Sequence, residues 1–308
     1  MEISKIRSDW NFEDASAIYN QPLLTLVYEA SRIHRDYHEP NEVQVCTLLS
    51  VKTGGCPEDC RYCPQAARYH TDVSAQNLLS VDEVVTAATR AKQAGSTRFC
   101  MGAAWREVKD NTDFDNVLEM ISQVSDMGLE VCGTLGMATE NQLQKMKAAG
   151  LHAYNHNVDT SEDFYGDIIS TRNYEDRLET LNNMRNANVT ICSGGIIGMG
   201  ESDMDRIKML LTLARLDKHP ESVPINALVS IEGTPLENQA PVSSWEMVRM
   251  IATARIMMPA SMVRLSAGRT EMSPEAQALC FMAGANSIFS GDKLLTTPNP
   301  SLGEDEQL

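Results

Sequence analysis

Apolar residues along the chain gather in short continuous runs that alternate with longer amphipathic stretches. Eight runs rich in β-branched and apolar residues predict buried strands: 43–51, 97–104, 129–135, 153–158, 189–197, 222–229, 262–268 and 286–291. Apolar residues at helical spacing lie between them, as in 80–95, 139–150, 174–188, 202–216, 243–259 and 273–284. Eight strands with seven intervening helical segments favour a closed TIM-type (β/α)8 barrel. The alternative is an open doubly wound sheet, which usually has fewer strands and a glycine-rich first turn.

The two ends of the chain lie outside this repeat. Residues 1–40 precede the first strand and form an N-terminal extension. Within it, 22–38 predicts one amphipathic helix that closes the bottom of the barrel or packs on its side. The barrel itself is assigned to 41–300. Residues 301–308 form an acidic end, for which we expect mobility.

Composition and charge limit the partners. The formal net charge is −16, and such an acidic surface repels phosphate backbones, so we expect no nucleic-acid partner. Apolar stretches are far shorter than a membrane span, and the N-terminus lacks the apolar core of a secretory signal. We therefore expect a cytoplasmic protein without membrane contact. In that compartment the 8 cysteines are metal ligands, catalytic thiols or buried small side chains rather than disulfides.

The most specific motif is GGCPEDCRYCPQ, directly after the first predicted strand. Cys56, Cys60 and Cys63 have the spacing C-x3-C-x2-C, which places three thiols on one loop around a single metal centre. A structural zinc site takes four closed ligands, usually from two separated C-x2-C pairs. This chain has one such pair and an offset cysteine. The spacing therefore favours a 4Fe–4S cluster with one iron left open.

Three further cysteines, Cys100, Cys132 and Cys192, each lie in a different predicted strand. One such cysteine alone is best interpreted as a small buried side chain. Three together favour a shared site, because barrel strands direct inward side chains to a common interior. Three thiolates leave a two-iron cluster one ligand short, and composition does not identify the fourth. Cys46 and Cys280 are interpreted as core residues.

The segment YNHNVDT closes the fourth predicted strand. Asn155, Asn157 and Asp159 alternate there, so their side chains point to one side if the strand continues. Amides and carboxylates suit polar ligands, but ordinary turn chemistry explains these residues equally well. The spacing of His152 and His156 aligns metal ligands only on a helix, and we reject a metal site because this segment predicts a strand.

These motifs make the chain resemble two nested families. The cysteine loop, with Tyr62 before its last cysteine, is similar to that of the radical S-adenosylmethionine enzymes. In that family the open iron of a 4Fe–4S cluster binds S-adenosylmethionine, which is cleaved to a deoxyadenosyl radical inside a full or partial α/β barrel. From about 22 to 300 the chain also resembles the biotin synthases, in stretches such as AGSTRFCMGAAW, FYGDIISTR, CSGGIIGMGE, RLSAGR and KLLTTPNP.

The second resemblance implies a sulfurtransferase that inserts sulfur between C6 and C9 of dethiobiotin to form biotin. It implies an inner 2Fe–2S cluster that supplies the sulfur, with the ligands Cys100, Cys132, Cys192 and Arg264. Without the resemblance, Arg264 is interpreted as a buried arginine paired with a carboxylate, because a guanidinium is a poor metal ligand. The resemblance also implies a low-potential electron donor of the flavodoxin or ferredoxin type, and a homodimer.

The same resemblance implies the binding residues. Those for S-adenosylmethionine are Tyr62, Asn157, Asp159 and Arg177. Those for dethiobiotin are Asn155 and Asn226 at the ureido ring and Thr296 and Thr297 at the carboxylate tail. Taken alone, Arg177 is interpreted as a solvated helix charge. Two other functions stay open: a radical S-adenosylmethionine mutase or maturase, which need not keep the inner cysteines, and a non-catalytic iron–sulfur or zinc protein.

Overall fold

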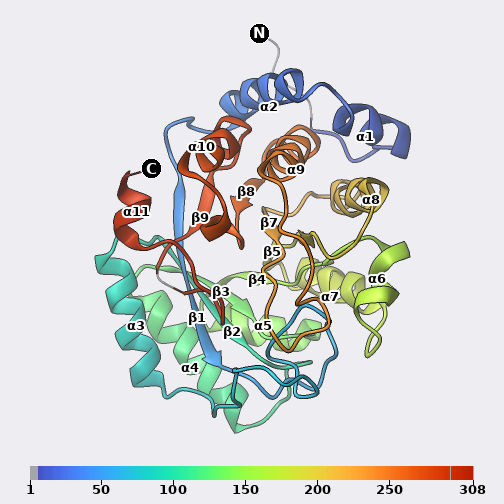
Figure 1. Cartoon of the computed structure of the whole chain (residues 1–308). Helices are drawn as coiled ribbons and strands as arrows, with labels where there is room; N and C mark the ends of the chain where they lie inside the picture. Colours follow the sequence, from blue (N-terminus) through green and yellow to red (C-terminus); the bar gives the residue numbers. More distant parts are fainter. Residues whose placement is uncertain (1–5, 292, 308) are drawn as a thin grey trace.

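Parallel strands close into a barrel at the centre of the molecule (Figure 1). The computed structural model describes residues 6–291 and 293–307. Neighbouring strands pair in parallel, β9 returns to β1, and β5 pairs with both β4 and β7, which closes the ring. The strands are β1 (Gln44–Lys52), β2 (Arg98–Ala103), β3 (Glu130–Thr134), β4 (Leu151–Asn155), β5 (Thr190–Cys192), β6 (Gly195–Ile197), β7 (Ser222–Ala227), β8 (Met262–Leu265) and β9 (Ser287–Phe289). Because β5 and β6 are two halves of one strand position, the predicted (β/α)8 barrel is confirmed.

Helices surround the barrel on its outer side (Figure 1). They are α3 (Val81–Gln93), α4 (Thr112–Asp126), α5 (Glu140–Ala148), α6 (Glu162–Ile168), α7 (Tyr174–Asn186), α8 (Asp203–Ala214), α9 (Ser244–Met257) and α10 (Pro274–Met282). Polar residues set where they begin: Ser80, Thr139 and Ser202 each accept a backbone N–H of the first turn, a contact worth about 1 kcal/mol. Helices α4 and α6 are not among the segments predicted from the sequence. None of the helices in the described ranges is long and apolar enough to cross a membrane.

The N-terminal extension packs on the side of the barrel. It contains α1 (Phe12–Tyr19) and α2 (Leu23–Tyr37), which contact α8 and α9. The indole Nε1 of Trp10 donates to the carbonyl of Met257 at 3.2 Å, and so ties the segment to the end of α9. The sequence left open whether this helical segment closes the bottom of the barrel or packs on its side. In the structure α2 packs on the side, against α9.

The acidic end of the chain contacts the barrel, although we expect it to be mobile. A short helix, α11 (Leu302–Gln307), follows the eighth strand position. Its Asp305 forms an ion pair with Arg269, whose side chain is 1% exposed and lies in a 3-10 turn at Arg269–Glu271. A buried guanidinium is costly without a counter-charge, so this acidic residue has a structural partner.

The barrel interior is separate from the main apolar core. That core lies between the strands and the surrounding helices. Inside the ring, a smaller buried group consists of Cys46, Cys100, Cys132, Ala153, Cys192 and Phe289. Barrel interiors are normally filled by branched apolar residues, so a group made mostly of cysteines marks this interior as a site.

A close backbone contact divides the fifth strand position. Between β5 and β6, a Cβ added at Gly194 would lie 1.9 Å from the carbonyl oxygen of Pro224 in β7. Only glycine therefore fits at this crossing, which holds β5 and β6 against β7.

Gly194→Ala is predicted to lower the free energy of unfolding by about 2 kcal/mol or more, because backbone atoms cannot move aside as a side chain does. The matched control is Gly166→Ala in α6, where an added Cβ meets nothing within 4 Å. That variant gains up to about 1 kcal/mol from helix propensity. Urea unfolding of the metal-free proteins measures both; equal midpoints for the two variants would contradict the packing account.

Candidate active site

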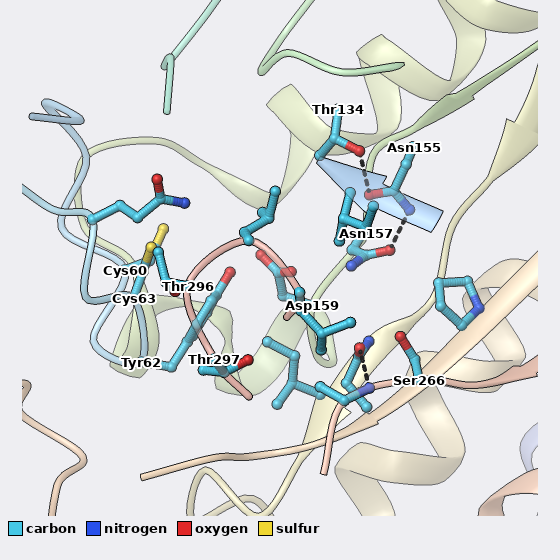
Figure 2. A pocket seen from close by; sticks show the side chains of 18 of the residues that line it. Cys60, Tyr62, Cys63, Thr134, Asn155, Asn157, Asp159, Ser266, Thr296 and Thr297 are labelled. Atoms are coloured by element: carbon cyan, nitrogen blue, oxygen red, sulfur yellow. Dashed lines mark hydrogen bonds between the residues drawn. The ribbon is translucent and has the colours of Figure 1, made fainter. Parts of the chain in front are cut away.

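One cavity of about 330 Å³ lies at the carboxyl ends of the barrel strands. This is the end at which barrel enzymes place their active sites. The cavity is lined by the loop cysteines, by Cys100, Cys132 and Arg264, and by all the residues predicted to bind cofactor or substrate. Figure 2 shows part of this lining, with Cys60, Tyr62 and Cys63 facing Thr296 and Thr297. Cys192 does not line it, but its sulfur lies 3.3 Å from Asn155 Nδ2. Residues from the whole length of the barrel thus converge on one site.

The loop cysteines occupy a tightly wound segment after β1. Gly54 and Gly55 have φ values of 68° and 70°, a left-handed conformation that turns the chain toward Cys56. The amide of Cys56 donates to Gln65 at 2.9 Å, and that of Cys63 donates to Cys60 at 2.9 Å. The loop is therefore folded around its thiols by its own backbone.

Burial controls the protonation of these thiols. It raises the pKa of Cys60 to about 11 and that of Cys63, which also lies near Cys60, to about 12. Within the described residues, no group of three or more His, Cys, Asp and Glu side chains is gathered closely enough to hold a single metal ion. A polynuclear cluster bonds each cysteine to a different iron, so its ligands need not converge on one point. Three half-buried or buried thiols on one cavity wall fit such a cluster, and binding it releases their protons.

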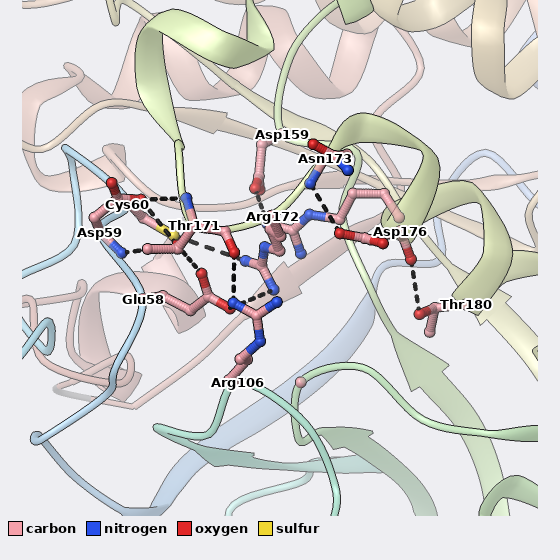
Figure 3. Close-up of polar contacts among 12 residues, drawn as sticks. Glu58, Asp59, Cys60, Arg106, Asp159, Thr171, Arg172, Asn173, Asp176 and Thr180 are labelled. Atoms are coloured by element: carbon pink, nitrogen blue, oxygen red, sulfur yellow. Dashed lines mark hydrogen bonds and ion pairs between the residues drawn. The ribbon is translucent and has the colours of Figure 1, made fainter.

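Acidic residues of the same loop hold a second loop in place (Figure 3). The carboxylate of Asp59 accepts the backbone N–H groups of Ser170 at 2.9 Å and Thr171 at 3.1 Å, and it also accepts both hydroxyls. Burial alone would raise the pKa of Asp59, but these hydrogen bonds outweigh it and lower the pKa to about 2. The loops that carry the motifs CPEDC and IISTR are therefore held together by hydrogen bonds.

The second loop brings a positive charge to the cysteines. The guanidinium of Arg172 donates to the sulfur of Cys60 at 3.7 Å. Glu58, 3% exposed, lies 3.9 Å from Arg172 and 3.2 Å from Arg106, which balances the buried charges. Hydrogen bonds to cysteine sulfur are one of the means by which proteins tune iron–sulfur clusters.

Asp159 and Arg177 form a buried ion pair in the cavity. Arg177 also receives support from Tyr165, whose hydroxyl lies 3.0 Å from its Nε. The interpretation of Arg177 as a solvated helix charge is therefore wrong, because its side chain is 6% exposed. Asp159 has a φ of 66°, uncommon for a residue with a side chain, and such conformations are held at sites by their surroundings.

The polar residues after β4 share the cavity although the strand ends at Asn155, three residues before its predicted end. Asn155 Nδ2 donates to Asn157 Oδ1 at 3.1 Å, and Asn155 Oδ1 accepts from Thr134 at 3.4 Å (Figure 2). The amide of Gly194 also donates to Asn157 Oδ1, at 3.2 Å. Since both acceptor sites of Asn157 are in use, its Nδ2 is the group left to meet a ligand.

Asn226 is partly engaged by backbone. Its Nδ2 donates to Gly195 at 2.9 Å and its Oδ1 accepts from the amide of Ala267 at 3.2 Å. An amide side chain has two N–H groups and two acceptor sites, so one of each remains for a ligand. Across the cavity, Thr296 and Thr297 lie in a turn that is closed by pairing of Lys293 with Pro298, near Tyr62 (Figure 2).

The inner thiols form a connected, fully buried set. Cys132 hydrogen-bonds with Cys100 and Cys192, which lowers the pKa of those two thiols and raises the pKa of Cys132. Thiolate is the form that binds metal, so the lowering of the pKa of Cys100 and Cys192 acts in the direction of metal binding. Arg98 lies beside them and its Nη1 is buried without a hydrogen-bond partner. An orphaned cationic donor next to thiolates fits an anionic cluster with its sulfides.

Arg264 faces these thiols and not a carboxylate. Its Nη1 lies 3.8 Å from the sulfur of Cys192 and its Nε donates to Ser287 at 2.9 Å. Burial by itself would lower the pKa of Arg264, but the surrounding cysteines raise it above its ordinary value. Among the described residues Arg264 has no carboxylate partner, so interpreting it as half of a buried ion pair is wrong.

Several site residues were not identified from the sequence. Asp59 and Arg172 act through contacts between loops far apart in the chain, which no spacing rule reveals. His156 lines the cavity with its Nε2 unpartnered, and burial keeps its pKa well below the ordinary value, so it is neutral. His152, by contrast, is 44% exposed and lies 3.8 Å from Glu130, and it is not among the residues that line the cavity. Cys46 was interpreted as core, and it is buried, but among the inner thiols.

Comparison with known sequences gives a consistent result over the full chain. Residues 50–214 match the Radical SAM superfamily, and residues 224–308 match the Biotin and Thiamin Synthesis associated domain. The biotin synthase of Cytophaga hutchinsonii is 65% identical over 306 residues, covering 99% of this chain and 91% of that protein. Those of Myxococcus xanthus and of a Nostoc species are 61% and 59% identical, covering 98% and 100% of this chain and 88% and 93% of theirs.

Solved structures support the fold. Methylornithine synthase superposes with a TM-score of 0.79 at 18% identity, covering 97% of this chain and 87% of its own. The FeFe-hydrogenase maturase from Carboxydothermus hydrogenoformans gives a TM-score of 0.81 at 15% identity, covering 97% and 73%. At these identities the likeness concerns the barrel alone.

Asp59→Asn is predicted to lower the free energy of unfolding by about 1–3 kcal/mol at pH 7, because the amide cannot accept all the hydrogen bonds that the carboxylate accepts. The pKa of Asp59 falls from 3.8 to about 2 on folding, so this stability is complete above about pH 4 and is lost as the pH falls through 2. Urea unfolding of the metal-free protein at several pH values measures it. The control is the exposed Asp217→Asn; a deficit for Asp59→Asn no larger than that of the control would refute the anchoring role.

Proposed function

The chain belongs to the biotin synthases, radical S-adenosylmethionine enzymes that convert dethiobiotin to biotin, and from this premise we propose how its residues divide the work. The matches at 59–65% identity over nearly the full length favour this activity over a mutase or maturase and over a non-catalytic scaffold. The observation in the structure that supports it is the presence of two separate thiol sets, one at the mouth of the cavity and one inside the barrel.

The outer set, Cys56, Cys60 and Cys63, is proposed to hold the 4Fe–4S cluster. When bound, that cluster supplies the electron that cleaves S-adenosylmethionine to a radical able to remove hydrogen from carbon. Three cysteines would hold three of the irons and would leave the fourth open for the amino and carboxylate groups of the cofactor. The protein's own part is to position the cofactor and to exclude water.

Tyr62, Asn157, Asp159 and Arg177 are proposed to bind S-adenosylmethionine. Burial raises the pKa of Tyr62 well above its ordinary value, so its hydroxyl stays protonated beside the cluster loop. The free Nδ2 of Asn157 donates to the cofactor. The Asp159–Arg177 pair presents both signs of charge to the amino acid part of the cofactor, an ammonium and a carboxylate.

Asn155, Asn226, Thr296 and Thr297 are proposed to bind dethiobiotin. A cyclic urea presents two N–H groups and one carbonyl, which complement the unused donor and acceptor of Asn226. The threonine hydroxyls receive the carboxylate tail at the other side of the cavity. Because Asn155 Nδ2 lies 3.3 Å from the sulfur of Cys192, the ureido end of the substrate would then lie next to the inner thiols.

The inner set, Cys100, Cys132, Cys192 and Arg264, is proposed to hold the 2Fe–2S cluster that gives up a sulfide to the product. Its thiols are between 0% and 2% exposed, which keeps this sulfur away from solvent and oxygen. A cluster held there would supply the sulfur for the insertions at C9 and C6 from inside the barrel, without sulfide from solution.

Three further features follow from the family. We propose a low-potential donor of the flavodoxin or ferredoxin type as the electron source, a cytoplasmic location and a homodimer. Leu24 and Tyr28, one turn apart on α2, are 80% and 71% exposed and are candidates for the dimer contact. Light scattering of the purified protein measures its mass directly.

The reaction itself is the primary test. Protein reconstituted without oxygen and supplied with S-adenosylmethionine, a strong reductant and dethiobiotin is expected to form biotin and 5′-deoxyadenosine, both measured by mass spectrometry. Cys60→Ala is expected to reduce both products to background. Cys280→Ala, another buried cysteine but on α10, retains both. Deoxyadenosine without biotin would point to a different radical enzyme, and absence of both from the native protein would refute the function.

Asn226→Leu tests the substrate assignment. We expect the dethiobiotin KM to rise roughly 10-fold or more, since one lost hydrogen bond to a buried ligand costs about 1.5 kcal/mol. Cleavage of S-adenosylmethionine measured without dethiobiotin should stay within about twofold of the native rate. The exposed Asn238→Leu is the control. A fall in the rate of S-adenosylmethionine cleavage with no change in the dethiobiotin KM would show that Asn226 binds the cofactor and not dethiobiotin.

A further inference from the structure

Cys46 lies inside the barrel with the inner thiols. It is in β1, its side chain is 0% exposed, and it belongs to the same buried group as Cys100, Cys132 and Cys192. In the sheet Cys46 pairs with Arg98, two residues before Cys100 on β2. Because side chains two apart on a strand share a face, Cys46 and Cys100 point to the same interior. The inner site therefore contains four thiols, one more than the three assigned to the cluster.

The fourth thiol touches the residue assigned as the fourth ligand. Arg264 Nη2 lies 3.3 Å from the sulfur of Cys46, while Nη1 lies 3.8 Å from that of Cys192. One guanidinium thus lies between an assigned ligand and an unassigned thiol. The hydroxyl of Ser287 forms a hydrogen bond of 3.7 Å with the sulfur of Cys46, in which either atom can be the donor. The same hydroxyl accepts from the Nε of Arg264. Stacking of Arg264 on Phe289, 4.6 Å from the ring centre, keeps the guanidinium in this position.

The chemistry of the two groups is unequal. A guanidinium holds its proton strongly and is a poor ligand, whereas thiolate is the normal ligand of iron–sulfur clusters. A weak ligand leaves its iron easily, above all in a cluster that loses sulfide during the reaction. The sulfur of Cys46, 3.3 Å from Arg264 Nη2, would be the thiol available to replace it.

We propose that Cys46 is an alternative fourth ligand of the inner cluster, which binds the iron when Arg264 leaves it. This inference rests on the proposed inner 2Fe–2S site. In the exchange the Cys46 S–H bond breaks and an iron–sulfur bond forms. The nitrogen of Arg264 leaves the iron and takes the released proton, so no oxidant or reductant is needed. The cluster thus has two forms, one with Arg264 as its fourth ligand and one with four thiolate ligands. Binding by Cys46 keeps the iron in the barrel when Arg264 leaves it.

The test is the content of the inner cluster in variants, measured without turnover. Native protein, Arg264→Met, Cys46→Ala and the double variant are reconstituted with iron-57 and sulfide and examined by Mössbauer spectroscopy. Arg264→Met and Cys46→Ala are each expected to keep the 2Fe–2S signal, and in Arg264→Met its spectrum is that of four thiolate ligands. In the double variant the 2Fe–2S signal is expected to fall at least ten-fold. Arg264→Met combined with Cys280→Ala is the matched control and retains it.

The 4Fe–4S signal of the same samples reports correct folding, because its cysteines lie on a separate loop. Should Arg264→Met fail to fold, Arg264→Lys replaces it. Loss of the 2Fe–2S signal from Arg264→Met alone, or an equal signal with and without Cys46 in that background, would overturn the proposal. Absence of any 2Fe–2S signal from native protein would instead refute the proposed sulfur source.

Discussion

Burial of two guanidiniums among cysteines inside a closed barrel is the constraint on which the rest of the structure depends. Arg98 and Arg264 are 4% and 1% exposed, and charges at that depth need partners of opposite sign. Arg98 has Glu130 on one side, 2.8 Å away, but its Nη1 is directed into the protein without a partner. Thiolates, and the anionic cluster they would hold, supply the missing charge. A charged metal centre, as proposed, fits this interior better than apolar packing does.

The outer part of the site depends on a second group of buried charges. Asp59 fixes the segment that carries Arg172, and Arg172 reaches Cys60. Asp159 and Arg177 pair deeper in the cavity. These contacts join loops that follow β1 and β4, so the loop with Cys56, Cys60 and Cys63 and the segment that carries Arg172 and Arg177 are held in a fixed geometry relative to each other. A cofactor whose bond must be broken at one position requires such fixed placement.

Much of the barrel could be predicted because its signal is local. Eight apolar runs predicted the strand positions; the bounds of the strands differ from the predicted ones by up to three residues, and the fifth position is divided into β5 and β6. The divided strand depends on the contact of Gly194 with Pro224, which no local pattern reveals. The loop cysteines were found from spacing alone, and Arg264 only through resemblance. Cys46 and Arg172 were missed because their importance comes from neighbours on other strands and loops.

The central claim is that the buried thiols hold the sulfur that enters the product. The most direct measurement is a single turnover of protein whose clusters were rebuilt with sulfur-34 sulfide, in a solution that contains only sulfide of natural abundance. The account predicts biotin that carries the sulfur-34 label, detected by mass spectrometry. Biotin of natural isotopic composition would show that the sulfur comes from solution, and would contradict the role assigned to the barrel interior.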